Sequence, residues 1–350
     1  MNLNEMIESA HQIIGEKKDT DYRINPSTHA ELYAETAPHL ADLLKSAGLA
    51  ITAKEYEEYD WDATDYRDSF TLWSNRMRWS VFLTAVFSAC LATFASWMII
   101  FHLQDSNLSK TVFSIIGILS VVFGASGMFC QQIVSKKNLL KNWMEKRSMA
   151  ESMRLKYFDS VILEKTDQAE AQAIPLDHLK LEYIRRYLLE EQHNYYKNRG
   201  REHEKSAGNL LFLSAGALTA VVIINGISSY LGFGDNYLSA ISVFALIAAA
   251  LSSMTSNIEE TNQDKRNAER YGRTVSALSN LWKRINEIHK AIFNGQVDLL
   301  YNYVQAITEV LSTEHRQWSK EFDLRLSAIG KLEAELDKFN QKMVNSSKSH

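Results

Sequence analysis

The sequence predicts an all-α, multi-pass membrane protein, and the distribution of charge is the main reason. Among its 350 residues, the stretch 80–133 contains only Asp105 and Lys110 as charged residues, and the stretch 209–258 contains only Asp235. Each stretch consists of two apolar runs joined by a short polar link, and each run has at least the roughly 20 residues that an α-helix needs to cross a bilayer. None of the four runs contains proline, which would interrupt a helix.

Four transmembrane helices are therefore expected, paired as two tandem hairpins with long helical cytoplasmic extensions. A buried helix of a soluble protein usually keeps one polar edge, whereas these runs have no charged edge, so a soluble helical core is the weaker alternative. The helices are expected at 79–103, 111–134, 209–231 and 237–256.

Basic residues lie on either side of the two hairpins and are almost absent from the links inside them. Arg76 and Arg78 precede the first run, Lys136 and Lys137 follow the second, and the two links hold only Lys110. Because cytoplasmic loops carry the excess of Lys and Arg, both termini and the middle segment are expected in the cytoplasm.

The two hairpins have similar surroundings, which indicates a duplication. An aromatic-x-Asn-Arg-x-Arg pattern precedes each hairpin, at 73–78 and at 196–201, and a Lys-Arg pair with an Ala-Glu pair follows each, within 146–154 and 265–273. The expected blocks are 1–62 (acidic N-terminal helices), 63–165 (first hairpin unit), 166–293 (second hairpin unit) and 294–350 (C-terminal amphipathic helix).

Three cytoplasmic features stand out in the sequence, and two of them have two interpretations each. The acidic run 55–68 is either a docking or autoinhibitory surface or a solvated helix face. The stretch around Pro175 divides the middle block into two helices. The heptad-like apolar spacing in 294–350 predicts packing within one subunit or a zipper between subunits.

The middle block also gathers basic and aromatic residues. Guanidinium groups bind phosphates in a bidentate manner, and aromatic rings stack on bases, so this composition suits an oligonucleotide or phosphate ligand. Anchoring at the cytoplasmic membrane surface is the alternative. The candidate ligand-binding residues are Arg185, Arg186, Lys197, Arg199, Arg201, Lys205, Tyr195 and Tyr196.

Small residues recur at three- and four-residue steps in the membrane runs. Such stripes let two helix backbones approach closely, and they could equally line a narrow pore. The candidates for the pore or for helix contacts are Gly117, Ser120, Gly124, Gly127, Ala245, Ala249 and Ser252.

Catalytic and cofactor motifs are absent from the sequence. No Walker A, GxGxxG, HExxH or GxSxG pattern occurs, and the two cysteines, Cys90 and Cys130, give no metal-ligand spacing. No enzymatic activity, metal or cofactor is therefore expected. The membrane runs also lack the buried charged residue that a proton-coupled transporter usually needs.

The chain resembles the SLATT family over roughly 65–287, as a tandem pair. The stretch 183–206 (YIRRYLLEEQHNYYKNRGREHEKS) is similar to the helix that enters such a hairpin, and 142–161 (NWMEKRSMAESMRLKYFDSV) is similar to the helix that leaves it. SLATT proteins are two-helix transmembrane effectors associated with nucleotide-second-messenger defence systems in bacteria. The tandem form also resembles the membrane effectors of the Hailong anti-phage defence system.

The resemblance implies a pore-forming effector of the bacterial inner membrane. It implies a homo-oligomer, with four subunits as the expected number, and control by a nucleotide or oligonucleotide made by a partner nucleotidyltransferase. Two other functions are compatible with the residues: a non-conducting membrane scaffold that recruits partners through its cytoplasmic helices, and a small-molecule transporter.

Overall fold

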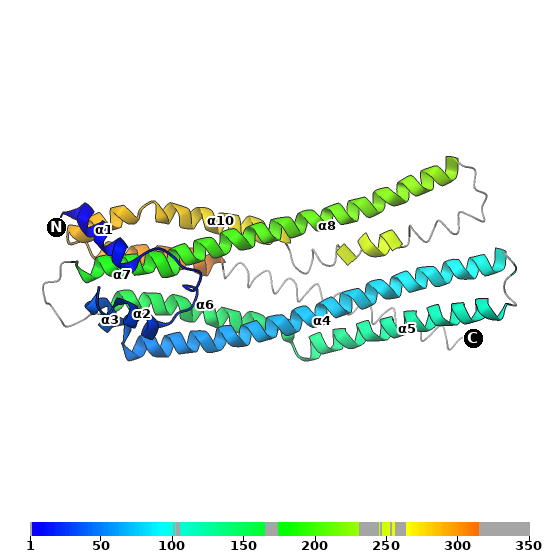
Figure 1. Ribbon diagram of the computed structural model, residues 1–350, viewed down its shortest axis with the longest axis horizontal. Helices are drawn as coiled ribbons and strands as arrows, with labels where there is room; N and C mark the ends of the chain where they lie inside the picture. Colours follow the sequence, from blue (N-terminus) through cyan, green and yellow to red (C-terminus); the bar gives the residue numbers. More distant parts are fainter. Residues whose placement is uncertain are drawn as a thin grey trace. The chain divides into compact units, whose positions relative to one another are not determined.

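The computed structural model describes residues 2–100, 102, 106–164, 174–230, 245, 247–252, 254, 255 and 264–314. Every regular element in this part of the chain is a helix, which confirms the predicted all-α class (Figure 1). The chain divides into two compact units made of segments that alternate along the sequence. In the described chain, unit 1 draws on 2–57, 151–198 and 270–314, and unit 2 draws on 58–150 and 199–269. The sequence-based boundaries, by contrast, divide the chain into consecutive blocks.

Unit 1 begins with three short helices, and each starts at a residue that favours a helix N-terminus. Helix α1 (Leu3–Ile14) begins with a capping box, in which Asn2 accepts from the Glu5 backbone amide and the Glu5 side chain accepts from the Asn2 amide. Helices α2 (Pro26–Tyr33) and α3 (Pro38–Leu44) each have proline in the first turn, where its missing N–H costs nothing.

Unit 1 contains further helices or parts of helices. They are the first part of α4 (Ala47–Ile100), the second part of α6 (Leu139–Leu163), α7 (Leu176–Ile184), a π-helical turn η1 (Arg185–Glu190), the beginning of α8 (Glu191–Tyr230), most of α10 (Asp264–Trp282), α11 (Ile285–Phe293) and a helical stretch over 298–314. Helix α1 packs against α7 and α11, and α2 packs against α3.

The core of unit 1 is rich in aromatic side chains. Tyr157, Phe158 and Tyr183 are completely buried, and the hydroxyl groups of Tyr157 and Tyr183 lie 2.9 Å apart. A buried tyrosine needs such a partner for its hydroxyl group. The predicted break around Pro175 is confirmed, because α6 ends at Leu163 and α7 begins at Leu176. The buried Lys180 ammonium donates to the carbonyl groups of Ile162 and Glu164 at the end of α6.

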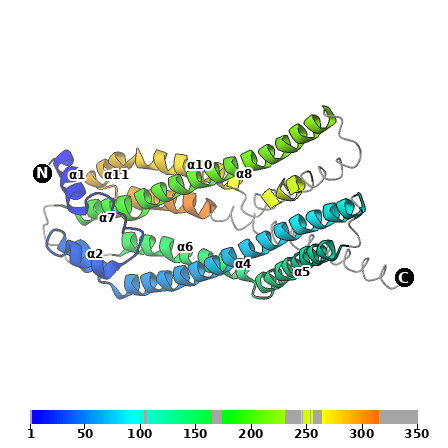
Figure 2. The same cartoon turned by 45° about the vertical axis from the view of Figure 1, so that its right-hand side comes forward.

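Unit 2 contains the first hairpin, in which α4 and α5 (Asn107–Lys136) run side by side in both views (Figure 2). The predicted runs 79–103 and 111–134 lie largely or wholly in these two helices, and the run 209–231 lies in α8 up to Tyr230. Of the fourth run, 237–256, only positions 245, 247–252, 254 and 255 are described, and all are helical. Most of that run, positions 104 and 105 of the first link, all of the second link (232–236) and positions 315–350 of the predicted C-terminal helix lie outside the described residues.

Within the part of the chain that the structure describes, three helices are long and apolar enough to cross a membrane. Their most apolar windows have mean hydropathies of 1.4, 2.1 and 1.8, yet only 11 %, 6 % and 0 % of the residues in those windows are buried. In water, leaving such windows uncovered would cost roughly 25 cal/mol per Å² of apolar surface. Large apolar side chains point outward on all three helices, among them Trp79, Val121 and Phe212. These features are those of a membrane protein.

Candidate functional site

The α7–η1 segment of unit 1 is buried although it carries many titratable side chains. Fully buried charges are costly unless they are paired and hydrogen-bonded. The sequence around η1, YIRRYLLEE, therefore depends on partners elsewhere in unit 1. The buried titratable side chains of this segment, apart from its tyrosines, are His178, Lys180, Glu182, Arg185, Arg186 and Glu190.

Arg185 connects two carboxylates with the end of α1. Its Nε donates to Glu182 Oε2 at 2.5 Å, its Nη1 donates to Glu190, and its Nη2 donates to the Gly15 carbonyl at 2.9 Å. Burial acts to lower the pKa of the Arg185 guanidinium, but the charges of Glu182 and Glu190 outweigh burial and raise the pKa. Gly15 has φ of 75°, a left-handed conformation that suits glycine and ends α1.

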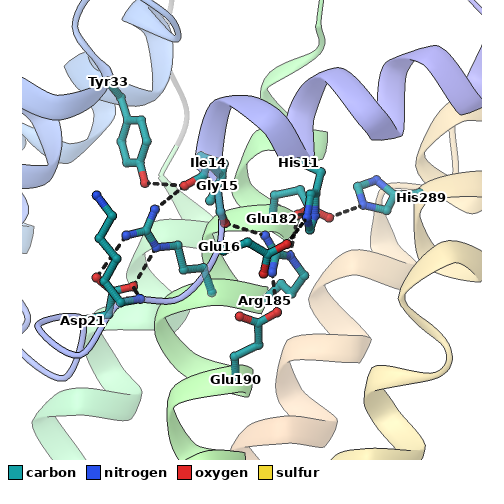
Figure 3. Close-up of polar contacts among 12 residues, drawn as sticks. His11, Ile14, Gly15, Glu16, Asp21, Tyr33, Glu182, Arg185, Glu190 and His289 are labelled. Atoms are coloured by element: carbon teal, nitrogen blue, oxygen red, sulfur yellow. Dashed lines mark hydrogen bonds and ion pairs between the residues drawn. The ribbon is translucent and has the colours of Figure 1, made fainter.

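Arg186 closes the same helix end from another side. Its Nε and Nη2 donate to the two carboxylate oxygens of Asp21 at 2.7 and 3.1 Å, and its Nη1 donates to the Ile14 carbonyl. The Tyr33 hydroxyl donates to the same carbonyl at 3.3 Å. Figure 3 shows these contacts around the C-terminus of α1. Cationic donors stabilise the orphan carbonyl groups and the negative dipole at a helix C-terminus.

Glu182 collects donors from three helices. His289 Nε2 lies 2.8 Å from Oε1, and His11 Nδ1 lies 3.1 Å from Oε2, which Arg185 also contacts (Figure 3). Burial acts to raise the pKa of Glu182, but the bonds from His289 and Arg185 outweigh it and lower the pKa. An ionised carboxylate only accepts, so both imidazoles donate to it.

His11 also lies between two carboxylates. Its Nε2 is 2.9 Å from Glu16 Oε1, while its Nδ1 contacts Glu182. The bond to His11 lowers the pKa of Glu16, so this carboxylate also accepts. His11 therefore connects Glu16, just after the end of α1, to Glu182 of α7.

His178 and His289 form a buried stacked pair. Their Nδ1 atoms are 2.8 Å apart, and their ring planes differ by 5°. Because His289 donates through Nε2, its Nδ1 accepts from His178 when His289 is neutral. The remaining nitrogen, His178 Nε2, has no hydrogen-bond partner among the described residues. Burial lowers the pKa of His178 to about 4, and the neighbouring His289 contributes in the same direction.

A cavity of about 410 Å³ opens beside this cluster in unit 1. Both oxygens of Glu182 are occupied, but Arg185 bonds only one oxygen of Glu190. Burial raises the pKa of Glu190 in spite of this bond. The lining of the cavity therefore combines titratable and apolar side chains. Its residues are Ile7, His11, Glu16, Glu182, Arg185, Glu190, Trp282, Lys283, Ile285 and Asn286.

The structure separates the predicted ligand-binding residues into three groups. Arg185 and Arg186 are 3 % and 4 % exposed and hold carboxylates of unit 1, so they do not belong to an exposed basic surface. Lys197, Arg201 and Lys205 are exposed on α8, and their four-residue spacing puts them on one face of that helix. We call these three residues the basic stripe.

The other three predicted residues lie away from the basic stripe. Arg199 is exposed, but it is two positions from Lys197 and therefore on the opposite side of α8, where it pairs with Glu202 at 2.6 Å. Tyr196 is buried, and its hydroxyl donates to Glu314 at 2.9 Å. Tyr195 is half-buried, and its ring packs edge-on against Tyr196. These two rings are packed within unit 1.

The predicted small residues of α5 lie against α4. A Cβ atom placed on Gly117 would lie 3.9 Å from Leu91, one on Gly124 would lie 3.6 Å from Thr84, and one on Gly127 would lie 3.4 Å from Ser80 and Val81. Between them, Ser120 Oγ lies 2.8 Å from Ser88 Oγ. This face of α5 packs on its partner helix in the hairpin.

The second hairpin has a similar hydroxyl contact. Ser252 Oγ lies 3.1 Å from Ser214 Oγ of α8. Of the other two predicted positions, Ala245 is half-buried and Ala249 is exposed. A serine pair thus joins the two helices in each hairpin, which is typical of helix association in membranes.

Sequence reasoning missed the acidic and imidazole partners of the arginines. Asp21, Glu182, Glu190, His11 and His289 come from four segments, and Asp21 is 165 positions from Arg186. One local signal was available: Glu182 and Glu190 lie three and five positions from Arg185, among apolar residues. Such carboxylates around an arginine in an apolar stretch indicate a buried ion cluster.

Comparison with known proteins gives one partial match. Residues 64–159 match the model of a family described as protein of unknown function (DUF4231). That range begins in α4, spans α5 and ends in α6. No curated protein matches the chain, and no solved structure matches it. Over its first hairpin and the following helix, the chain is therefore similar to a family whose activity has not been described.

Proposed function

We propose that this chain is a pore-forming effector of the bacterial inner membrane, which assembles as a homo-oligomer and responds to a nucleotide or oligonucleotide on its cytoplasmic side. The observation that supports the proposal most is the uncovered state of the three apolar helices, of whose apolar windows at most 11 % is buried. A bilayer or neighbouring copies in a bilayer would cover these surfaces. Both termini lie in the cytoplasm in this proposal, and the signal comes from a partner nucleotidyltransferase.

Helix continuity supports a gated rather than a constitutive pore. Helix α4 runs without interruption from Ala47 to Ile100, and α7, η1 and α8 form one continuous helix from Leu176 to Tyr230. A long helix that extends from water into lipid can transmit a small displacement, because packed elements move as rigid bodies. A ligand shifts the populations of two states only if it contacts them differently.

The basic stripe is the best candidate for the ligand contact. Lys197, Arg201 and Lys205 are exposed and lie just before the apolar part of α8, and none of them has an ion-pair partner among the described residues. Their spacing of four residues is about 6 Å along the helix. Three cations in a row provide charge-assisted donors for a phosphate backbone.

Ion flux in liposomes tests the proposal. The reconstituted protein is expected to release a trapped cation, and a short oligodeoxynucleotide is expected to raise or lower this flux. Replacing the three residues of the basic stripe with Gln is expected to shift the half-effective ligand concentration at least about tenfold, since a charged hydrogen bond contributes about 1.5–3 kcal/mol. The matched control is Lys136→Gln with Lys137→Gln and Lys141→Gln, which removes three exposed lysines elsewhere and should keep the response.

Two results would contradict the proposal. Absence of flux with every ligand, together with stable partner capture, would favour the non-conducting scaffold. An equal ligand response in the stripe variant and in the control would remove the basic stripe from the mechanism. Arg185 and Arg186 are unsuitable for this test, because their replacement would disturb unit 1 itself.

A further inference from the structure

The part of α4 that precedes its apolar window carries a large exposed aromatic side chain. Trp61 is 76 % exposed, the highest value among the large apolar side chains of unit 2 apart from Phe212 in the apolar part of α8. Asp65, Asp68 and Leu72 follow it at three- and four-residue steps and are also exposed, so the four residues lie on one side of the helix. We call them the Trp61 face.

Some acidic residues of α4 form ion pairs with α6, and others do not. Asp60 and Asp62 pair with Arg147 and Lys146 of α6, each at 2.7 Å. Asp65 has no ion pair in the described part of the chain, and Asp68 pairs only with its neighbour Arg67. Part of the acidic run is therefore used inside unit 2, while the Trp61 face keeps its negative charge toward the outside.

The basic stripe of α8 is the complementary surface of the same chain. It is positive and exposed, although Glu204 flanks it. No ion pair joins it to the Trp61 face within the described residues of one copy. An exposed indole ring beside carboxylates suits a partner with Lys and Arg side chains, through ion pairs and cation–π contacts.

The bilayer places the two surfaces at matching levels. The apolar part of α4 begins at Trp79 and that of α8 begins at Asn209. At about 1.5 Å per residue, Asp68 and Leu72 lie about 16 and 10 Å before the first of these positions, and Lys197 and Arg201 lie about 18 and 12 Å before the second. Two copies that share one membrane therefore hold acidic and basic positions within a few ångströms of the same height.

We propose that the Trp61 face of one copy docks on the basic stripe of a neighbouring copy. This inference rests on the membrane placement in the proposed function, and it identifies the surface through which the oligomer forms. Each exposed ion pair contributes little by itself, so the contact depends on several charges and on burial of the indole ring. The neighbour's carboxylates then occupy the cations to which a phosphate ligand would bind.

Cross-linking between two single-cysteine chains tests the contact. Cys90 and Cys130 are first replaced with Ala. One chain then carries Leu72→Cys and the other Arg201→Cys, and both are produced together in membranes and treated with a short bis-maleimide. A product of dimer mass can form only between copies. The matched control replaces the second chain with Arg199→Cys, which lies at nearly the same level but on the opposite side of α8.

The expected result is a dimer band several-fold stronger with Arg201→Cys than with Arg199→Cys, beyond the bands of each chain alone. Asp65→Lys with Asp68→Lys on the chain that carries Leu72→Cys should weaken the dimer band. Adding Lys197→Glu with Lys205→Glu on the chain that carries Arg201→Cys should restore the band. High salt should weaken it too, since the screening length falls to about 3 Å at 1 M.

An equal band with both second chains, or a band unaffected by charge reversal, would overturn the inference. If the protein conducts ions but gives no such band, the proposed function stands and the proposed contact is wrong. If the protein stays dispersed in detergent-free buffer, both proposals are wrong.

Discussion

Replacing Arg186 with Met tests whether the arginines of η1 hold unit 1 together. The guanidinium is 4 % exposed and makes a two-point contact with Asp21, at 2.7 and 3.1 Å, and a further bond to the Ile14 carbonyl. Methionine fills a similar volume without donors. The change leaves Asp21, which is 6 % exposed, as a buried carboxylate whose remaining side-chain bond comes from the Lys18 amide at 2.8 Å.

The size of the effect follows from this geometry. Removing one partner of a buried ion pair costs about 3–5 kcal/mol, because the other charge stays buried without compensation. The loss of a charged donor at the C-terminus of α1 adds to the cost. Since about 1.4 kcal/mol is a factor of ten, local opening of α1 should become roughly 10²- to 10⁴-fold more frequent.

Amide hydrogen exchange of the protein in lipid nanodiscs measures this opening directly. Exchange within Leu3–Ile14 should accelerate by that factor in the variant, while exchange in α5 should not change. A double variant, Arg186→Met with Asp21→Leu, removes both charges and should cost less than the sum of the two single variants. The control is Arg201→Met, in which an exposed arginine is lost.

Two outcomes would refute the reasoning. Unchanged protection of α1 in Arg186→Met would show that the ion pair does not hold the helix. Strict additivity in the double variant would show that Arg186 and Asp21 do not interact. Either result would show that Arg186 does not stabilise unit 1 through Asp21.

Two more perturbations test other parts of the structure. Burial lowers the pKa of His29, and of His178, to about 4. Each histidine therefore contributes stability that is present above about pH 6.5 and is lost as the pH falls toward 4. Amide hydrogen exchange across unit 1 should show a progressive loss of protection between those pH values, and a protection that does not change with pH would contradict the burial argument. Gly127→Leu should force α5 away from Ser80 at a cost of about 1–3 kcal/mol, whereas Gly216→Leu, with nothing near its Cβ position, should have little effect. Thermal stability in detergent measures the second pair, and equal melting temperatures would argue against the described hairpin packing.

Much of the fold could be predicted from the sequence because a membrane-spanning segment must meet a simple physical requirement. Lipid requires long apolar helices without charge, and the predicted run 111–134 falls inside Asn107–Lys136 as the structure shows it. The break near Pro175 was also predictable, since proline interrupts helices. The division into two units was not, because it depends on which distant segments pack together.

The candidate site was only partly predictable. Arg185 and Arg186 have the same local sequence features as exposed basic residues, and nothing nearby reveals that the C-terminus of α1 and Asp21 lie against them. Lys197, Arg201 and Lys205 form no ion pair within the described residues, and they are exposed. Arg185 and Arg186 are buried against residues more than 160 positions away, and a local pattern cannot show such a tertiary contact.

The two units differ in which side chains are exposed and which are buried. In unit 2 the apolar side chains point outward, so lipid or another copy must cover them. In unit 1 the charges of η1 point inward, so carboxylates and helix carbonyl groups must neutralise them. A substitution that removes charge therefore has different meanings at different positions of one continuous helix: at Arg186 it tests the fold, and at Arg201 it tests recognition. Any search for the ligand must separate these two, and the exposed basic stripe is where it should begin.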